Sequence, residues 1–173
     1  MRKAICVFSL LLLSSLGAFA QTTPKVEVFA GYSLQHARPE GVLPGANGSG
    51  WDASLNYNLR SWLGVKADFS GYYCCAAQRE HNFLFGPQVT LRHEHHDIFF
   101  HALVGVSHGI GDNFPVDTVA AWDLGAGLDV RPFHSDRFSL RVAQLDYLGT
   151  HYAEFAQHHF RYSGGFVFRF GSK

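Results

Sequence analysis

The sequence predicts an all-β protein, an eight-stranded antiparallel up-and-down transmembrane β-barrel. Three observations lead to this fold class. The N-terminus has the layout of an export signal, the rest of the chain alternates apolar and polar residues in eight segments, and the connections between the segments alternate between long and short. A β-barrel that crosses a bilayer is expected to show all three features.

The composition agrees with a single β-rich domain. The chain has 173 residues, of which 47% are hydrophobic, 15% aromatic and only 16% charged. So few charges and so many aromatic rings exclude a long disordered chain. The formal net charge is zero and the chain has no basic block, which argues against binding nucleic acid through its phosphates.

Residues 1–20 are predicted to be a secretory signal peptide. A basic start is followed by an apolar run over residues 4–16, and small residues precede a cut between Ala20 and Gln21. The run is short for a membrane helix, although an N-terminal anchor that is never cut is the alternative. No later segment is apolar enough to predict a spanning helix. The barrel domain is therefore expected to be residues 21–173.

The rest of the chain alternates with period two, which is typical of strands with one apolar face. The predicted strands are residues 25–34, 50–59, 63–73, 82–91, 97–107, 118–130, 137–148 and 159–170. In the seventh segment the apolar residues change parity between Val142 and Leu145, which predicts a β-bulge near Ala143. Pro87 removes one backbone donor inside the fourth segment, so a second bulge is expected there.

The predicted connections alternate in length along the chain. The long ones are residues 35–49, 74–81, 108–117 and 149–158, and the short ones are residues 60–62, 92–96 and 131–136. Bacterial membrane barrels have short periplasmic turns and longer external loops. A tilted membrane strand needs about 9–11 residues, which these segments supply.

Side-chain volume predicts which face of the strands points outward. A soluble barrel of the lipocalin kind also alternates, so periodicity alone leaves both possibilities open. An eight-stranded barrel has an interior only just wide enough for side chains to fill. The bulky apolar face would overfill that interior, whereas the small, polar and charged face would fit, with Phe29, Phe99 and Leu103 as exceptions. We therefore expect the aromatic face to contact lipid.

The aromatic residues are also predicted to gather at the two ends of the strands, as girdles at the membrane–water interfaces. Those expected near the long-loop ends are Tyr32, Trp51, Tyr73, Phe83, Tyr147, Phe160 and Tyr162. Those expected near the short-turn ends are Trp62, Phe138, Phe168 and Phe170.

Three segments carry a resemblance to a known family. They are the opening Val26-Glu-Val-Phe-Ala-Gly-Tyr-Ser33, the segment Leu145-Asp-Tyr-Leu148 and the ending Gly164-Gly-Phe-Val-Phe-Arg-Phe170. In these the chain resembles the small outer-membrane β-barrel proteins, akin to the OmpA transmembrane domain and OmpX, over residues 21–173.

The resemblance implies a location in the outer membrane and contact with its lipids and lipopolysaccharide. It also implies that the last strand is read by the barrel assembly machinery through Phe166, Phe168 and Phe170, although Gly171, Ser172 and Lys173 follow the last of these. The motifs specify a family rather than an activity.

The charged residues of the polar face are expected to pair with one another in the lumen, since buried charges are tolerated when paired. The predicted network consists of Glu27, Lys66, Asp68, Asp123, Asp129, Arg141, Asp146, Arg161 and Arg169. Folding the hairpins should bring Asp129 to Arg141 and Asp146 to Arg161, and closing the barrel should bring Glu27 to Arg169. A narrow gated pore is the alternative to this structural interpretation.

The histidines and cysteines lack a recognised ligand spacing, so neither a metal site nor a cofactor is predicted. His93, His95 and His96 crowd one predicted turn, where solvated loop histidines are the better interpretation. Cys74 and Cys75 are adjacent in a predicted external loop and receive no function.

The function predicted from these observations is that of a monomeric, non-catalytic barrel with a structural or surface-display role in the cell envelope. A lipid A-modifying enzyme is a competing hypothesis, for which His151, Glu154 and Ser163 are the nearest constellation. The sequence also leaves open a soluble periplasmic carrier and the gated pore.

Overall fold

The computed structural model describes residues 23–39, 46–74, 78–111, 114–132, 135, 137–151 and 156–172. The predicted cleavage site at Ala20 and Gln21, and Cys75, lie outside these residues. Cys74 is the last residue of its strand. Within the described residues, no helix combines the length and the apolar character needed to cross a membrane.

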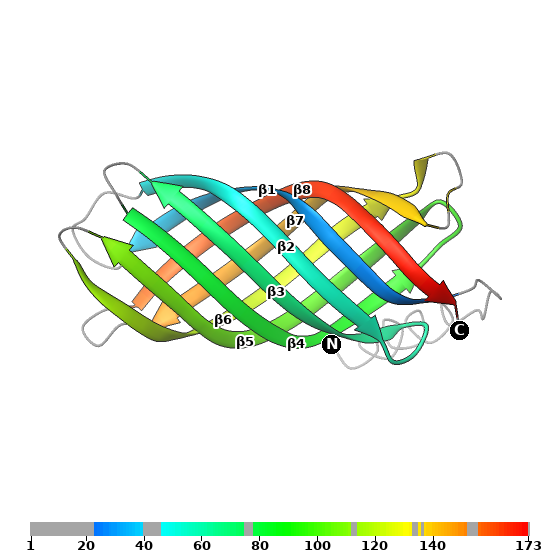
Figure 1. The fold of residues 1–173 in the computed structure, drawn as a ribbon, viewed down its shortest axis with the longest axis horizontal. Coiled ribbons are helices and arrows are strands. Elements are labelled where there is room, and N and C mark those ends of the chain that lie inside the picture. Colours follow the sequence, from blue (N-terminus) through cyan, green and yellow to red (C-terminus); the bar gives the residue numbers. More distant parts are fainter. Residues whose placement is uncertain are drawn as a thin grey trace, which may run out of the picture.

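The described residues form eight antiparallel strands that close into one barrel in sequence order (Figure 1). The strands are β1 (Pro24–Pro39), β2 (Ala46–Asn58), β3 (Leu63–Cys74), β4 (Gln78–Arg92), β5 (His96–Gly111), β6 (Phe114–Val130), β7 (Phe138–His151) and β8 (Ala156–Ser172). The register pair Pro24 and Ser172 joins the first strand to the last. The predicted fold class is therefore confirmed.

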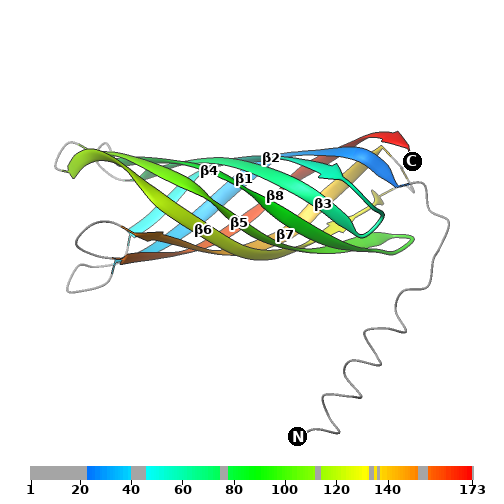
Figure 2. The same ribbon diagram turned by 90° about the horizontal axis from the view of Figure 1, so that it is seen from below.

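The barrel is elongated, and its strands are inclined to its long axis (Figures 1 and 2). Pro24 and Ser172 lie at one end, which we call the terminal end, together with the connections β2–β3, β4–β5 and β6–β7. The other four connections lie at the opposite end, which we call the loop end.

Most strands continue toward the loop end beyond the predicted bounds. The β1–β2 hairpin, for example, still pairs Ala37 with Ala46. The expected alternation of long and short connections is accordingly wrong, because the β3–β4 connection is confined to residues 75–77 and the β6–β7 connection runs from residue 131 to 137. Alternating hydrophobicity marks only the part of a hairpin with an apolar face, whereas backbone hydrogen bonds also pair polar residues.

The predicted bulge in the seventh strand is confirmed. On the β8 side the register passes from Arg141 opposite Gly165 to Gln144 opposite Ser163, so two residues of β7 face one of β8. The register with β6 shifts at the same point, between Leu128 and Asp129. The extra residue lets Leu140 and Leu145, which differ in parity, both face outward.

The bulge expected at Pro87 is absent. Pro87 is paired with Val65 of β3 in an uninterrupted register. On the β5 side, Phe85 pairs with Val104 and Gln88 with His101, which is the same register on both sides of the proline. Each residue of a strand directs its N–H toward only one of the two neighbouring strands. The missing N–H of Pro87 therefore interrupts the hydrogen bonds to β5, and neither strand gains an extra residue there.

The bulky apolar face points outward and the polar face points inward, as side-chain volume predicts. Phe166 is 52% exposed and Phe69 and Trp122 are also exposed, whereas Asp68 and Arg141 are buried. Phe29, Phe99 and Leu103, the exceptions on the polar face, lie buried in the lumen.

Candidate functional site: the polar lumen

The lumen is filled by layers of polar side chains between the two ends of the barrel. At the terminal end, Glu27 accepts hydrogen bonds from Arg92 at 2.8 Å and from Arg169 at 3.3 Å. Asp97 accepts from Arg169 at 2.6 Å and from Arg131 at 2.5 Å. These five residues form a compact cluster that closes the terminal end of the lumen.

The next layer is built around Arg141 of β7. Its guanidinium donates to both carboxylate oxygens of Asp129, at 2.8 and 3.1 Å. The same guanidinium lies over the rings of both Phe29 and Phe99, with centroid distances of 4.3 and 4.2 Å. A cation stacked on aromatic faces is favourable when both are removed from water, which explains why two phenylalanines occupy the polar face.

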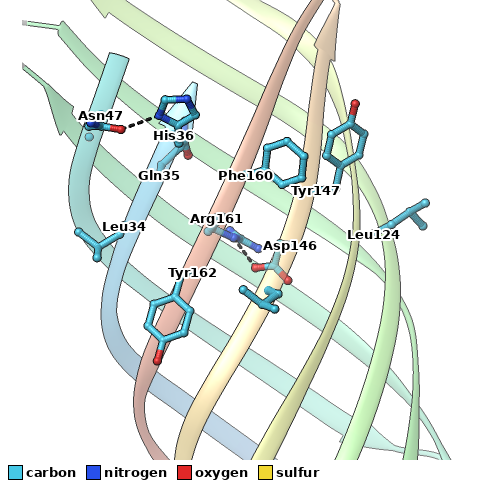
Figure 3. A pocket seen from close by; sticks show the side chains of 12 residues that line it. Leu34, Gln35, His36, Asn47, Leu124, Asp146, Tyr147, Phe160, Arg161 and Tyr162 are labelled. Carbon is cyan, nitrogen blue, oxygen red and sulfur yellow. Dashed lines mark hydrogen bonds and ion pairs between the residues drawn. The ribbon is translucent and has the colours of Figure 1, made fainter. Parts of the chain in front are cut away.

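The central layer is built around Arg161 of β8, which is fully buried. Its guanidinium binds Asp146 at 2.5 Å, Asp123 at 2.7 Å and Asp68 at 3.0 Å. Figure 3 shows Arg161 and Asp146 directed toward each other from neighbouring strands. Asp68 also lies 3.0 Å from Lys66 Nζ. One arginine therefore joins carboxylates from β3, β6 and β7.

His101 of β5 belongs to the same layer. Its Nε2 lies 3.1 Å from Asp146 Oδ1 and 3.6 Å from Asp123 Oδ2, and all three side chains are excluded from solvent. Gln144 extends the layer, because its amide donates to Asp146 at 2.8 Å and to Asp52 at 3.5 Å.

Toward the loop end the lumen becomes less charged. A small apolar cluster consists of Leu84, Leu103, Ala121 and Leu148. The hydroxyl of Ser33 lies 2.8 Å from the hydroxyl of Ser163 and 3.0 Å from that of Tyr72. Ser163 thus faces the lumen.

The structure brings all nine predicted lumen residues into ion pairs inside the barrel, including the three pairs expected from strand pairing. The predicted network leaves out six residues that belong to these layers: Asp52, Arg92, Asp97, His101, Arg131 and Gln144. The signal was present for Arg92 and Arg131, because extending the period-two pattern one step past the apolar residues places both on the inner face.

The predicted assembly residues Phe166, Phe168 and Phe170 lie on the outer face of β8 and are exposed. At the terminal end, the rings of His93 and His96 are stacked 4.7 Å apart. Arg131 donates to the backbone carbonyls of His93 and Glu94, at 2.7 Å each.

The outer wall carries a shallow depression of about 670 Å³ across β1, β2, β6, β7 and β8 (Figure 3). The exposed apolar side chains that line it are Leu34, Leu124, Leu145, Phe160 and Tyr162.

Solved structures share this architecture. Neisserial surface protein A matches 84% of this chain and 97% of its own, with a TM-score of 0.72 and 14% identity. OprG from Pseudomonas aeruginosa matches 88% of this chain and 98% of its own, with a TM-score of 0.61 and 8% identity. Ail, the attachment invasion locus protein of Yersinia pestis, matches 84% and 99%, with a TM-score of 0.59 and 16% identity.

The chain has the fold of the small outer-membrane β-barrels. At these identities the likeness concerns the fold. No protein-family model matches the sequence, and no curated protein sequence is significantly similar to it.

Proposed function

We propose that this protein is an integral outer-membrane protein whose barrel acts as a rigid, non-catalytic frame in the cell envelope. The observation that carries the proposal is the division between the two faces of the strands. The outer face presents exposed apolar side chains on every strand, and the inner face holds buried charges. In hydrocarbon all backbone polar groups must be paired internally, and a closed barrel meets that requirement.

The heights of the aromatic side chains support a membrane-spanning orientation. Tyr73 is exposed near the loop end of β3, and Trp62 and Phe168 are exposed toward the terminal end. Tyrosine and tryptophan favour the headgroup region, because one part of the side chain is apolar and another is polar. The outer depression between Leu34 and Leu124 would then be filled by acyl chains of lipid or lipopolysaccharide.

An outer-membrane location and a display role follow from the same reasoning. The predicted signal peptide would export the chain, and the aromatic outer face of β8 would present Phe166, Phe168 and Phe170 to the assembly machinery. The similar structures include one named as a surface protein and one named for attachment and invasion. We propose that the loop end likewise faces the cell exterior and presents its connections for contact.

A monomer is favoured by the closure of the sheet. Strand β8 pairs with β1 from Pro24 to Pro39 and with β7 on its other side. The described strands thus leave no unpaired sheet edge on which a second chain would add.

The lumen argues against the soluble carrier. A carrier barrel would need an apolar interior cavity for its ligand. Here the central layers hold ion pairs around Arg141 and Arg161.

A lipid A-modifying enzyme is also disfavoured, since Ser163 bonds to Ser33 inside the lumen, away from lipid. Glu154 and the side chain of His151 lie outside the described residues. Incubation of the folded protein with lipid A tests the enzymatic hypothesis, and loss of acyl chains would contradict the non-catalytic proposal.

Gel mobility with and without boiling, combined with cell fractionation, tests the proposal as a whole. A folded membrane barrel should change mobility on heating and should leave the membrane fraction only with detergent. Release by osmotic shock, or a mobility that heating leaves unchanged, would overturn the proposal.

A further inference from the structure

Three ligand-type side chains from three consecutive strands meet in the central layer of the lumen. They are His101 of β5, Asp123 of β6 and Asp146 of β7, and one ligand atom from each lies within 4.8 Å of the others. Among the described residues, this is the one group of three such side chains whose ligand atoms lie this close together.

The distances within this group match those between two ligands of a single metal ion. Metal bonds to imidazole nitrogen and carboxylate oxygen are about 2.1 Å long, so two such ligands lie about 3.0 Å apart at right angles and about 3.4 Å apart at a tetrahedral angle. His101 Nε2 lies 3.1 Å from Oδ1 of Asp146 and 3.6 Å from Oδ2 of Asp123, an oxygen to which Arg161 also donates.

Several polar atoms of these three side chains have no hydrogen-bond partner within the described residues. Both ring nitrogens of His101, and Oδ1 of Asp123 and of Asp146, are buried without a hydrogen-bond partner. The contact from Nε2 of His101 to Oδ1 of Asp146 is 3.1 Å long.

Arg161 leaves these atoms available. Its guanidinium binds Oδ2 of Asp146 and Oδ2 of Asp123, so Oδ1 of each carboxylate remains. Unsatisfied buried polar atoms are rare in folded proteins and costly. A cation bound by Nε2 of His101 and by Oδ1 of each carboxylate would leave the bonds to Arg161 intact, and Nδ1 of His101 would not be part of the site.

The charge of the central layer also calls for a cation. The layer contains the four carboxyl groups of Asp52, Asp68, Asp123 and Asp146 and the two cationic groups of Lys66 and Arg161. With all four carboxyl groups ionised and His101 neutral, these groups have a net charge of −2. A divalent cation would balance it, and uncompensated buried charge is strongly unfavourable.

The surroundings hold the ligands in a dry, tight position. Asp123 has Leu103 and Leu148 as its register partners on β5 and β7. A side-chain carbon at Gly125 would overlap both Asp146 Oδ1 and His101 Nε2. Glycine at position 125 therefore lets the two ligands lie against the barrel wall.

We propose that His101, Asp123 and Asp146 bind one divalent first-row transition cation of the Zn²⁺ type inside the lumen. One imidazole nitrogen with two carboxylate oxygens suits such ions, whereas Ca²⁺ and Mg²⁺ prefer oxygen ligands alone. The bound ion links β5, β6 and β7 and so stabilises the central layer. Because the lumen is filled on both sides, the ion enters during folding and leaves slowly.

The test is to refold the mature chain, without a histidine tag, from urea into detergent micelles with one equivalent of Zn²⁺. After treatment with EDTA and gel filtration, the folded barrel should retain about one Zn²⁺ per chain. Refolding with Co²⁺ should give a visible absorption spectrum that Zn²⁺ abolishes when it is present during folding. A folded wild-type barrel that retains no metal would overturn the proposal.

Two variants separate this site from the other histidines. His101→Gln leaves both carboxylates bonded to Arg161 and should lower metal retention or affinity by more than about tenfold. His93→Gln, at the terminal-end turn, should retain metal as the wild type does. Each variant is checked for folding by its gel mobility before and after boiling. If folded His101→Gln retains as much metal as the wild type, or if His93→Gln loses it, the assignment is wrong.

Discussion

Arg161 of β8 and Asp146 of β7 face each other in the register, and Arg161 Nε lies 2.5 Å from Asp146 Oδ2 in the centre of the barrel. The guanidinium continues from this pair across the lumen to Asp68 on β3. Arg161, whose contact with Asp146 was predicted from one hairpin, thus also links strands on opposite sides of the barrel.

Replacement of this arginine is the first prediction. Arg161→Met should lower the free energy of unfolding by about 3–5 kcal/mol, because it removes the buried cation that pairs with three buried carboxylates. Urea unfolding in detergent micelles measures the change. Arg60→Met, at an exposed residue of the β2–β3 turn, is the control and should change stability by less than about 0.5 kcal/mol. Similar losses for both variants would contradict a central role for Arg161.

The stacking of Arg141 on two rings leads to a second prediction. Phe99→Leu removes one of the rings from the buried guanidinium and should destabilise the barrel by about 1–3 kcal/mol. The matched control is Phe100→Leu, because the next residue along β5 faces outward and is 49% exposed. Its loss should be smaller when both variants are unfolded in the same micelles. Equal losses would mean that the inner ring contributes no more than an outer one.

Charge on the outer wall provides a third prediction. Val104, in the middle of β5, is 57% exposed. If this face contacts lipid, Val104→Arg should cost about 2–4 kcal/mol in bilayers, whereas Leu91→Arg, near the terminal end of β4, should cost about 0–1 kcal/mol. Unfolding of the barrel from lipid vesicles gives both values. A cost that does not depend on depth would contradict the membrane-spanning orientation.

The filled lumen leads to a fourth prediction. The wild-type barrel should show no steady ion conductance in planar bilayers, because the layers around Arg92, Arg141 and Arg161 close it in series. A single Arg92→Ala variant should remain closed, since the other two layers still fill the lumen. Stable conductance steps from the wild type would favour the gated pore instead.

Ion pairs between adjacent strands could be predicted from the sequence, whereas contacts across the lumen could not. Asp129 with Arg141, and Glu27 with Arg169, are register partners on adjacent strands. Such pairs follow from the period of two and the order of the strands, both of which are local properties of the chain. The outward position of Phe166 follows from the same alternation and from the small volume of an eight-stranded interior.

The meeting of His101, Asp123 and Asp146, and the stacking of Arg141 on phenylalanine rings, could not be predicted in this way. His101 and Asp146 lie on strands that are not neighbours, and Phe29 reaches Arg141 from β1 to β7. These distances depend on the diameter of the barrel and on the stagger of its strands, which are properties of the closed sheet as a whole. Alternation and side-chain volume in the sequence determined the barrel and its two faces. Only closure of the sheet decided which inner side chains meet, because contacts across a lumen have no fixed spacing along the chain.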